Sequence, residues 1–329
     1  MRLTVISAAE IAQQVEGNRH ICLDLVRRAY LAYAEGHSAL PFSSFLRFPG
    51  RPRDRIIALP AYLGGEFDVS GLKWIASYPG NVEQGLPRAS GLLVLNDTST
   101  GFPYACLEAS LISATRTAAS AVLAAEALLG GRWAERVGFV GAGFIAGHVR
   151  RFLGELGWDV GGYRIFDLRG EAARRFAADL GDAGDVAVVE RVEDAITGCD
   201  LVVLATVAGE PHLAGLDLLR HGPVILHISL RDLHPELVLA ARNITDDIDH
   251  ALRERTSLHL AEQAAGHRRF VHGTIADLLS GSVRREPGEA VIFAPFGLGV
   301  LDLALASWIH RETVARGGGT QMSGVFPEV

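Results

Sequence analysis

Residues 137–153 read VGFVGAGFIAGHVRRFL, an apolar run followed by glycines and then by residues at helical spacing. The apolar run is typical of a buried strand, and 144–156 suits a helix. A G-x-G-x-x-A pattern alone is a weak signal. Here it joins a strand to a helix, as the phosphate-binding turn of a dinucleotide fold requires. The segment therefore predicts the first strand and helix of a Rossmann domain.

Each residue of this turn has an expected role. Gly141 makes the tight turn, Gly143 lets the backbone approach a pyrophosphate, and the small Ala146 lets helix and strand pack closely. Phe144 and Ile145 begin the helix, whose free N–H groups and positive dipole end attract phosphates. We therefore expect these five residues to contact the cofactor.

The type of dinucleotide depends on the next strand, YRIFDL (163–168). Asp167 lies where a carboxylate receives the ribose hydroxyls of NAD and repels the extra phosphate of NADP. Arg169 can serve NADP, so both cofactors stay open and NAD is favoured. Thr206 ends the strand 200–206, at the edge where the nicotinamide lies in this fold. A cofactor contact and a plain strand-end threonine are both open interpretations.

Alternating strands and helices continue through this region and predict a doubly wound parallel sheet covered on both faces. Before it, 42–109 contains short apolar stretches separated by Gly, Pro, Asn and Asp, which indicate a sheet with hairpin turns. We predict an α/β protein with two domains. An α+β substrate-binding and dimerisation domain comprises 1–115, joined by 316–329, and an NAD-binding Rossmann domain comprises 116–315.

Composition limits the class of partner. The chain has 329 residues, 49% of them hydrophobic, and a formal net charge of -7, which argues against a nucleic-acid surface. We find no signal peptide and no uncharged apolar run that would span a bilayer; 111–129 is interpreted as a buried helix. The three cysteines lack a paired spacing, so neither a disulfide framework nor a metal site is indicated. We expect a cytoplasmic protein without nucleic-acid, membrane or metal partners.

Four basic residues outside the glycine-turn region are candidates for binding carboxylates. Lys73 lies in an otherwise apolar strand, and Arg116 lies in the most apolar helix, where an unpaired cation is costly. A substrate carboxylate is a natural bidentate partner for Arg116, and a structural salt bridge is the alternative. Arg88, at the start of a strand, and Arg47, in FLRF, are further candidates.

One carboxylate in the Rossmann region is a candidate for proton transfer. Asp232 lies in HISLRDLHPE (227–236), directly after a strand, at the edge where ligands bind in this fold. A carboxylate there can take or give the proton that accompanies hydride transfer. His227, His234 and Arg231 compete for the same role.

Several longer stretches resemble the ornithine cyclodeaminase/mu-crystallin family. They are GLKWIASYPGN (71–81), GLPRASGLLVLNDTSTGFPYACLEAS (85–110), ISATRTAAS (112–120), the glycine motif and IFAPFGLGVLDLA (292–304). PRAS, HISLRDL and TSLHLAEQ (256–263) are most similar to the branch that oxidises N-(2-amino-2-carboxyethyl)-L-glutamate with NAD. The resemblance implies formation of 2-oxoglutarate and L-2,3-diaminopropionate, the latter for siderophores and peptide antibiotics.

The resemblance also implies roles for single residues. Asp232 is the implied catalytic acid/base, and Asp302, in GVLDLA, is implied to lie near the nicotinamide. The implied contacts of the substrate, an amino-acid-like molecule with three carboxylates, are Lys73 and Arg116, with Arg47 and Arg88 as helpers; Lys73 is also a catalytic candidate. A homodimer built through the first domain's sheet is implied as well. Many relatives carry Gln where Ile145 stands, which puts one side-chain contact in doubt but not the turn.

Three other functions compete with this one. An ornithine cyclodeaminase would make proline and ammonia without net NADH. A reductase of imines or ketimines, or an alanine dehydrogenase-like enzyme, would use NAD(P)H or NAD on a smaller substrate. A binding protein for small hormones and nicotinamide cofactor is the third, although Lys73, Arg116 and Asp232 together favour chemistry over binding alone.

Overall fold

The structure is a computed structural model that describes residues 2–181 and 183–327. The chain divides into two compact units. Unit 1 comprises Met1–Arg116 with Gly297–Val329, and unit 2 comprises Thr117–Phe296. The predicted boundary between 315 and 316 differs from this division, because helix α10 (Gly299–Ala315) packs on helix α2 and on strands of unit 1.

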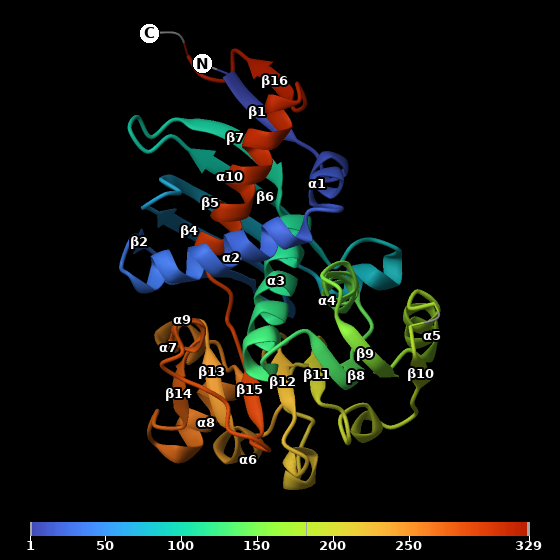
Figure 1. Cartoon of the computed structure of the whole chain (residues 1–329). Coiled ribbons are helices and arrows are strands. Elements are labelled where there is room, and N and C mark those ends of the chain that lie inside the picture. Colours follow the sequence, from blue (N-terminus) through green and yellow to red (C-terminus); the bar gives the residue numbers. More distant parts are fainter. Residues whose placement is uncertain (1, 182, 328–329) are drawn as a thin grey trace. The chain divides into compact units, whose positions relative to one another are not determined.

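Unit 1 is built on a mixed sheet with the strand order β16-β1-β7-β6-β5-β4-β2, and β3 pairs with β4 (Figure 1). Helices α1, α2 and α10 pack against it. The strands are β1 (Arg2–Ile6), β2 (Ser38–Ala39), β3 (Ser44–Phe48), β4 (Arg51–Leu63), β5 (Val69–Ser77), β6 (Ala89–Asn96), β7 (Pro103–Glu108) and β16 (Thr320–Ser323). The helices are α1 (Ala8–Val15), α2 (Arg19–Ala34), a 3-10 helix (Pro79–Gln84), the start of α3 (Ala109–Leu129), and α10.

The helices of unit 1 follow from their sequences. In α2 the apolar residues recur at helical spacing, so one face is buried, and Gly36 ends the segment with a φ of 81°. Helix α10 is apolar on most sides and is buried over most of its length. The Glu108 carboxylate caps α3, because it accepts the N–H groups of Ser110 and Leu111.

Helix α3 is long and apolar enough to cross a membrane by length and composition alone, with a mean hydropathy of 1.2. Within that window 67% is buried inside the structure. A core helix of a globular protein meets the same criterion, so this one helix is weak evidence for a membrane span. The burial agrees with the prediction of a buried helix.

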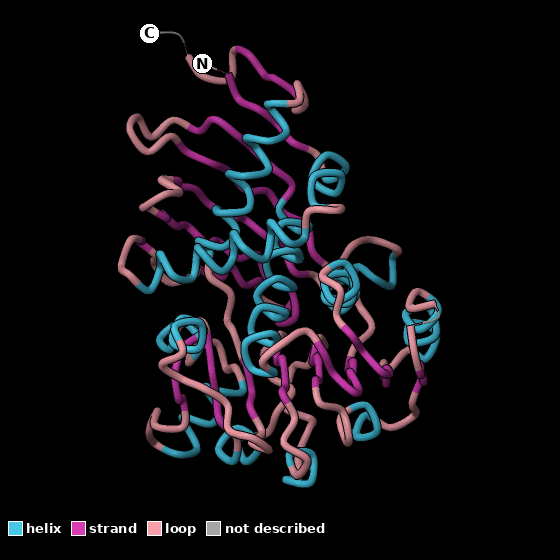
Figure 2. The backbone as a smooth tube through the Cα atoms, viewed as in Figure 1, coloured by secondary structure: helices cyan, strands magenta, loops and turns pink. Residues whose placement is uncertain are grey.

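Unit 2 is built on a sheet in which every described strand pair is parallel. Its strands, in magenta, alternate along the chain with helices and loops (Figure 2). The strand order is β10-β9-β8-β11-β12-β15-β13-β14. The strands are β8 (Trp133–Val140), β9 (Asp159–Phe166), β10 (Asp185–Val188), β11 (Leu201–Leu204), β12 (Val224–His227), β13 (Arg242–Thr245), β14 (Val271–Thr274) and β15 (Val291–Phe293). The helices are the rest of α3, α4 (Phe144–Glu155), α5 (Gly170–Ala178), α6 (Pro235–Ala240), α7 (Ile248–Ala251), α8 (Ser257–Ala265), α9 (Ile275–Ser280), and 3-10 helices at Val192–Ala195 and Leu216–Leu219.

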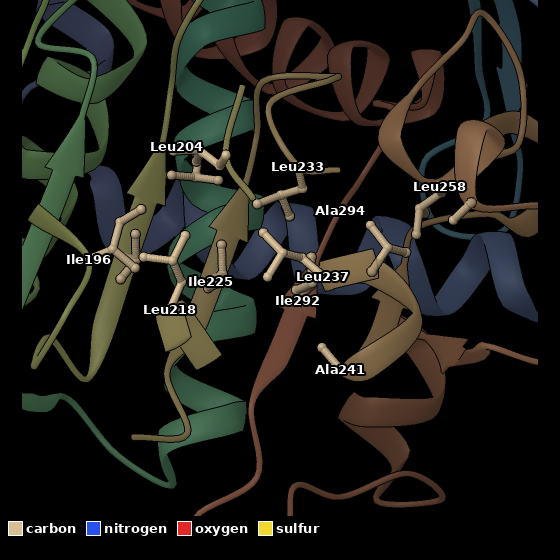
Figure 3. Close-up of a cluster of buried hydrophobic side chains, with 14 of the residues drawn as sticks. Ile196, Leu204, Leu218, Ile225, Leu233, Leu237, Ala241, Leu258, Ile292 and Ala294 are labelled. Carbon is tan, nitrogen blue, oxygen red and sulfur yellow. The ribbon is translucent and has the colours of Figure 1, made fainter. Parts of the chain in front are cut away.

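This order confirms the predicted doubly wound sheet. The chain builds β8, β9 and β10 outward in one direction and then returns to start β11 on the other side of β8. Ligands bind where the direction reverses, beyond the carboxyl ends of the strands. Beneath that edge lies a core of strand and helix side chains, among them Leu204, Ile225, Leu237, Leu258 and Ile292 (Figure 3). The core fixes the strand ends that carry the site.

Candidate functional site

The glycine turn of unit 2 connects β8 to α4. Gly141 has a φ of 91°, and a Cβ there would lie 2.6 Å from the carbonyl oxygen of Ala205. Only glycine fits that position, because both the backbone conformation and the space exclude a side chain. At Gly143 a Cβ would meet nothing within 4 Å. The outer side of the turn is thus open, as the close approach of a pyrophosphate requires.

The start of α4 has the features of an anion site. Gly143 is the N-cap and offers no side-chain cap, so the first N–H groups of the helix keep their donor capacity. Ala146 is fully buried, which matches its predicted packing role, and Ile145 is half-buried. Phe144 is exposed, and its ring lies edge-on to that of His148 at 4.4 Å.

Asp167 follows β9 and binds the glycine turn itself. Its Oδ2 accepts the N–H of Ala142 at 2.8 Å, and its Oδ1 accepts the N–H of Arg169 at 2.8 Å. The Arg169 side chain is only a loose partner, at 3.9 Å from Oδ1. Each carboxylate oxygen keeps acceptor capacity for a further donor, such as a ribose hydroxyl. The position therefore fits the expected ribose contact.

A second group of polar side chains lies at the same edge of the sheet, after β11 and β12. Asp232 is fully buried, and its Oδ1 accepts the hydroxyl of Thr206. Nε2 of His227, the last residue of β12, lies 3.1 Å from the Asp232 Oδ2. Thr206 is next to Ala205, the residue that crowds Gly141, so this group adjoins the glycine turn. The structure thus brings Thr206 and Asp232 together.

The Asp232 carboxylate is held in its ionised form. Burial alone would raise its pKa, but hydrogen bonds and charge from His227, with hydrogen bonds from Ser229 and Thr206, lower the pKa to about 2. A second histidine lies near the same carboxylate: His212 Nε2 is 3.9 Å from the Asp232 Oδ1, and the His212 side chain is partly exposed. Asp232 is therefore a fixed negative charge at the carboxyl edge of the sheet.

Unit 1 contains a buried group of charges on β5, α3 and α10. Lys73 Nζ lies 2.6 Å from the Asp302 Oδ2, and Arg116 Nε lies 3.2 Å from the Asp302 Oδ1. Lys73 is 2% exposed and Asp302 0%. Ser113 Oγ, one helical turn before Arg116, accepts from Lys73 at 3.1 Å and from Arg116 at 3.2 Å. Two cations thus share one carboxylate, which leaves an excess of positive charge.

The surroundings of this group control its charge and shape. Burial lowers the pKa of Lys73 to about 8, the nearby Arg116 lowers it as well, and Asp302 opposes both effects. Gly297 has a φ of 97°, and a Cβ there would lie 2.5 Å from an Arg116 Nη1. The chain approaches the guanidinium this closely because residue 297 has no side chain.

The other two predicted cations lie elsewhere on the sheet of unit 1, Arg47 on β3 and Arg88 directly before β6. Arg88 donates from Nη1 to Ser77 Oγ at 2.9 Å, and burial lowers its pKa. Arg47 is exposed on β3, with its guanidinium 5.3 Å from the Phe45 ring. Neither is bonded to the Lys73 group in the described contacts.

Sequence reasoning missed the link between Asp302 and the two cations. The expectation for Asp302 was a place near the nicotinamide, which stays a prediction; its bonds to Lys73 and Arg116 were not foreseen. Two partners were open for Arg116, a substrate carboxylate and a structural salt bridge. The salt bridge to Asp302 is present, and because Lys73 shares the same carboxylate, the group keeps an excess of one positive charge. Ser113, which accepts from both cations, was not among the predicted site residues. The signal for Asp302 was a carboxylate in an apolar helix, which needs a cation partner.

Comparison with known proteins now identifies the group to which these sites belong. The model of the ornithine cyclodeaminase/mu-crystallin family matches residues 4–317. The chain belongs to this family. The predicted resemblance is therefore confirmed.

Individual relatives are similar over nearly their full length. N-((2S)-2-amino-2-carboxyethyl)-L-glutamate dehydrogenase of Staphylococcus aureus is 28% identical over 329 residues, which cover 97% of both chains. An archaeal alanine dehydrogenase, solved as a dimer with bound NAD, is 26% identical with a TM-score of 0.86, over 98% of this chain and 100% of that one. The Delta(1)-pyrroline-2-carboxylate reductase of Thermococcus litoralis, solved with NADH and L-proline, has a TM-score of 0.89 at 23% identity, over 96% of this chain and 99% of that one, and supports the fold.

Proposed function

We propose that this protein is an NAD-dependent dehydrogenase that converts N-(2-amino-2-carboxyethyl)-L-glutamate to L-2,3-diaminopropionate and 2-oxoglutarate, for siderophore or peptide natural-product synthesis. The observation that carries the proposal is the buried Lys73–Asp302–Arg116 group, whose excess positive charge suits a carboxylate. The family and the similarity to the Staphylococcus aureus enzyme support the same reaction. NAD is the cofactor with which relatives were solved.

The residues present fit NAD. Gly141 and Gly143 leave the turn open to a pyrophosphate, and the start of α4 offers N–H donors. Asp167, which binds the turn, is assigned the ribose hydroxyls, and Thr206, next to the Ala205 that approaches the turn, is assigned the nicotinamide side. Held there, NAD would supply the hydride acceptor for the glutamate-side α-carbon of the secondary amine.

Lys73 and Arg116 bind the carboxylate on the reacting carbon. Arg116 supplies a planar, permanently charged guanidinium, and Lys73 supplies a donor whose pKa of about 8 lets it exchange a proton near neutral pH. Asp302 is a positioning residue, because it holds both cations from a fully buried site. This binding orients the carbon that loses the hydride.

Asp232 acts on the amine and on water. Loss of the hydride leaves a positively charged imine carbon–nitrogen group, and an ionised carboxylate stabilises that charge. The same carboxylate accepts a hydrogen bond from the water that adds to the imine, with Thr206 and His227 holding its oxygens. Collapse of the adduct breaks the carbon–nitrogen bond and releases the keto acid and the diamino acid.

The direct experiment follows nicotinamide absorbance after mixing the protein and NAD with N-(2-amino-2-carboxyethyl)-L-glutamate, ornithine, or L-alanine in separate reactions. The proposal expects NADH and 2-oxoglutarate in equal amounts from the first substrate only. Ammonia and proline from ornithine without net NADH would identify a cyclodeaminase instead. NADH from L-alanine alone would identify an alanine dehydrogenase, and oxidation of NADH by a cyclic imine alone would identify a reductase.

We also propose a homodimer that forms through the sheet of unit 1. Trp74 and Leu92 are direct partners on β5 and β6, so they share one face of the sheet, and they are 42% and 53% exposed. Leu46 on β3 is also exposed. Apolar side chains that gather on one exposed sheet face favour burial against a second copy.

The dimer is tested by light scattering after size-exclusion chromatography. Trp74→Glu is expected to shift the protein toward monomer, whereas Leu216→Glu, an exposed leucine of unit 2, is the matched control and should not. A wild type that elutes as a monomer would refute the dimer.

We propose a cytoplasmic location as well, in keeping with the free thiols of Cys22, Cys106 and Cys199.

A further inference from the structure

Unit 2 has an open cavity of about 690 Å³ at the amino ends of β13, β14 and β15. Its walls come from the beginnings of β13 and β14, the residues directly before β15, the ends of α6 and α8, and the loop 266–270 (Figure 1). The glycine turn and Asp232 lie at the carboxyl edge of the same sheet, where this fold binds its cofactor. The cavity is therefore separate from the candidate cofactor site.

Part of the lining of this cavity is apolar. Phe270 and Ala241 are buried, and Leu239 at the end of α6 is 41% exposed. Ala265 and Ala290 add small side chains that leave room between the helix ends and the strands. Small-molecule sites typically have volumes of roughly 300–1,000 Å³ and combine apolar walls with a few polar groups. The cavity therefore has the size and the apolar surface for a molecule with a carbon ring system.

Arg242, the first residue of β13, supplies a fixed guanidinium to the lining. Its Nε donates to the Glu289 Oε2 at 2.8 Å, and the same oxygen accepts the backbone N–H of Glu286 at 3.0 Å. Within residues 2–181 and 183–327, the two terminal nitrogens of Arg242 donate no hydrogen bond. A guanidinium held through Nε alone keeps its terminal N–H groups for a further anion.

Two further donors lie on the β14 side of the cavity. Arg269 is exposed, and its guanidinium forms no hydrogen bond or ion pair with the described part of the chain. His272 Nδ1 accepts the backbone N–H of Asn243 at 3.1 Å, so the proton of the neutral ring is on Nε2. Burial and the nearby Arg242 lower the pKa of His272, which keeps the ring neutral and its Nε2–H a donor near neutral pH.

The permanently charged side chains of the lining have an excess of one positive charge. Arg242 and Arg269 are cations, and Glu289 is the anion that holds Arg242 in place. A ligand with a single negative charge balances this excess, and the planar guanidinium groups suit the two oxygens of a carboxylate. The apolar part of the lining suits the rest of such a ligand, because its carbon atoms leave water when it binds.

We propose that this cavity is a second ligand site, which binds a small organic monoanion with an apolar body, such as an aromatic carboxylate. Arg242 and Arg269 bind the acid group, His272 donates a further hydrogen bond, and Phe270 and Leu239 contact the apolar body. The site is additional to those of the cofactor and the substrate, and it does not depend on which amino-acid-like molecule the enzyme oxidises.

The test measures the binding of 2-naphthoate to the NAD-saturated protein by isothermal titration calorimetry. Uncharged 2-naphthamide is the matched ligand, because it has the same ring system without the charge. The acid is expected to bind roughly 10-fold more tightly than the amide, since charge-assisted hydrogen bonds are lost with the charge. Arg269→Gln should lower the affinity for 2-naphthoate by about 10-fold and leave that for 2-naphthamide nearly unchanged.

The neighbouring arginine provides the matched control. Arg268 is also exposed, but its guanidinium donates to Glu262 at 2.6 Å and to Asp249 at 2.7 Å. Arg268→Gln should therefore bind 2-naphthoate like wild type. Leu239→Glu places a negative charge in the lining without removing a cation, and it should weaken 2-naphthoate binding even if Arg269→Gln folds poorly. The melting temperature reports folding for all variants.

Four results would overturn the proposal. They are no binding of 2-naphthoate by wild type at millimolar concentration, equal affinities for the acid and the amide, equal losses in Arg268→Gln and Arg269→Gln, and displacement of 2-naphthoate by NAD. Loss of binding in Lys73→Met would place the ligand in unit 1 and overturn it as well. The activity of the enzyme toward its substrate enters none of these measurements, so the proposed function stands or falls separately.

Discussion

Asp302→Asn removes one negative charge from a buried group of two cations. The carboxylate lies 2.6 Å from Lys73 Nζ and 3.2 Å from Arg116 Nε, and no part of Asp302 is exposed. Breaking a buried pair by deleting one partner costs about 3–5 kcal/mol, because the remaining charge is left without compensation. In a chain of this size, such a loss lowers the melting temperature by on the order of 10 °C.

The same change alters the pH dependence of activity. Asp302 raises the pKa of Lys73 against the effects of burial and Arg116, so its removal moves that pKa below about 8. In the proposed function, Lys73 binds the substrate carboxylate only in its charged form. In wild type, kcat/KM should therefore fall as pH rises through about 8, and in Asp302→Asn the fall should begin at lower pH.

The free energy of unfolding of the wild type should rise with pH, whereas kcat/KM should fall. The pKa of Lys73 is about 8 in the folded protein and 10.5 for an unperturbed lysine, so between these values the unfolded chain binds more protons than the folded one. Stability contributed by this site therefore rises with pH across that window. The rise is measured from denaturant midpoints at several pH values, with Lys73→Met as the variant that should lack it.

A double variant tests the electrostatic explanation. Lys73→Met alone leaves Arg116 paired with Asp302, and adding it to Asp302→Asn restores the original excess of one positive charge. The double variant should melt above Asp302→Asn, although it lacks both partners of the 2.6 Å contact. If Asp302→Asn melts like wild type and keeps its pH profile, or if the double variant is less stable still, the reasoning is wrong.

Three further predictions concern unit 2. Asp232→Asn should lower kcat by about 10²- to 10⁴-fold while NAD binding stays measurable by fluorescence titration, because it removes a charge used in the reaction; near-normal turnover would exclude Asp232 from the chemistry. Asp167→Ala should weaken NAD more than NADP in calorimetry, because the acid is placed to accept the ribose hydroxyls; equal weakening would contradict the NAD preference. Gly141→Ala should lower NAD affinity and destabilise the protein by about 1–3 kcal/mol, because its Cβ would meet the Ala205 carbonyl; unchanged binding and melting would show that the turn accepts a side chain.

Local patterns in the sequence predicted the parts of the fold that depend on neighbouring residues. The segment 144–156 was predicted as a helix, and α4 forms over Phe144–Glu155. The glycine turn was predicted as the junction of β8 and α4, and Gly141 has the positive φ that such a turn needs. Both depend on spacing within a few residues, which is visible in a single sequence.

Contacts between distant residues were not available from the same patterns. Asp302 meets Lys73 across 229 positions, and no local rule relates the two. Arg55 faces Arg47 only because β3 and β4 pair in one particular register, and a shift of one residue would turn its side chain to the other face. The candidates Lys73 and Arg116 were found from the cost of burying a cation, but their shared partner required the structure.

Gly297 has a consequence for attempts to redesign this protein. Any other residue there would push a methyl group into the Arg116 guanidinium, so a library that varies residue 297 would lose substrate affinity before it tested a new substrate. Directed evolution of substrate range should therefore hold this glycine constant, so that the guanidinium of Arg116 keeps its position in every variant.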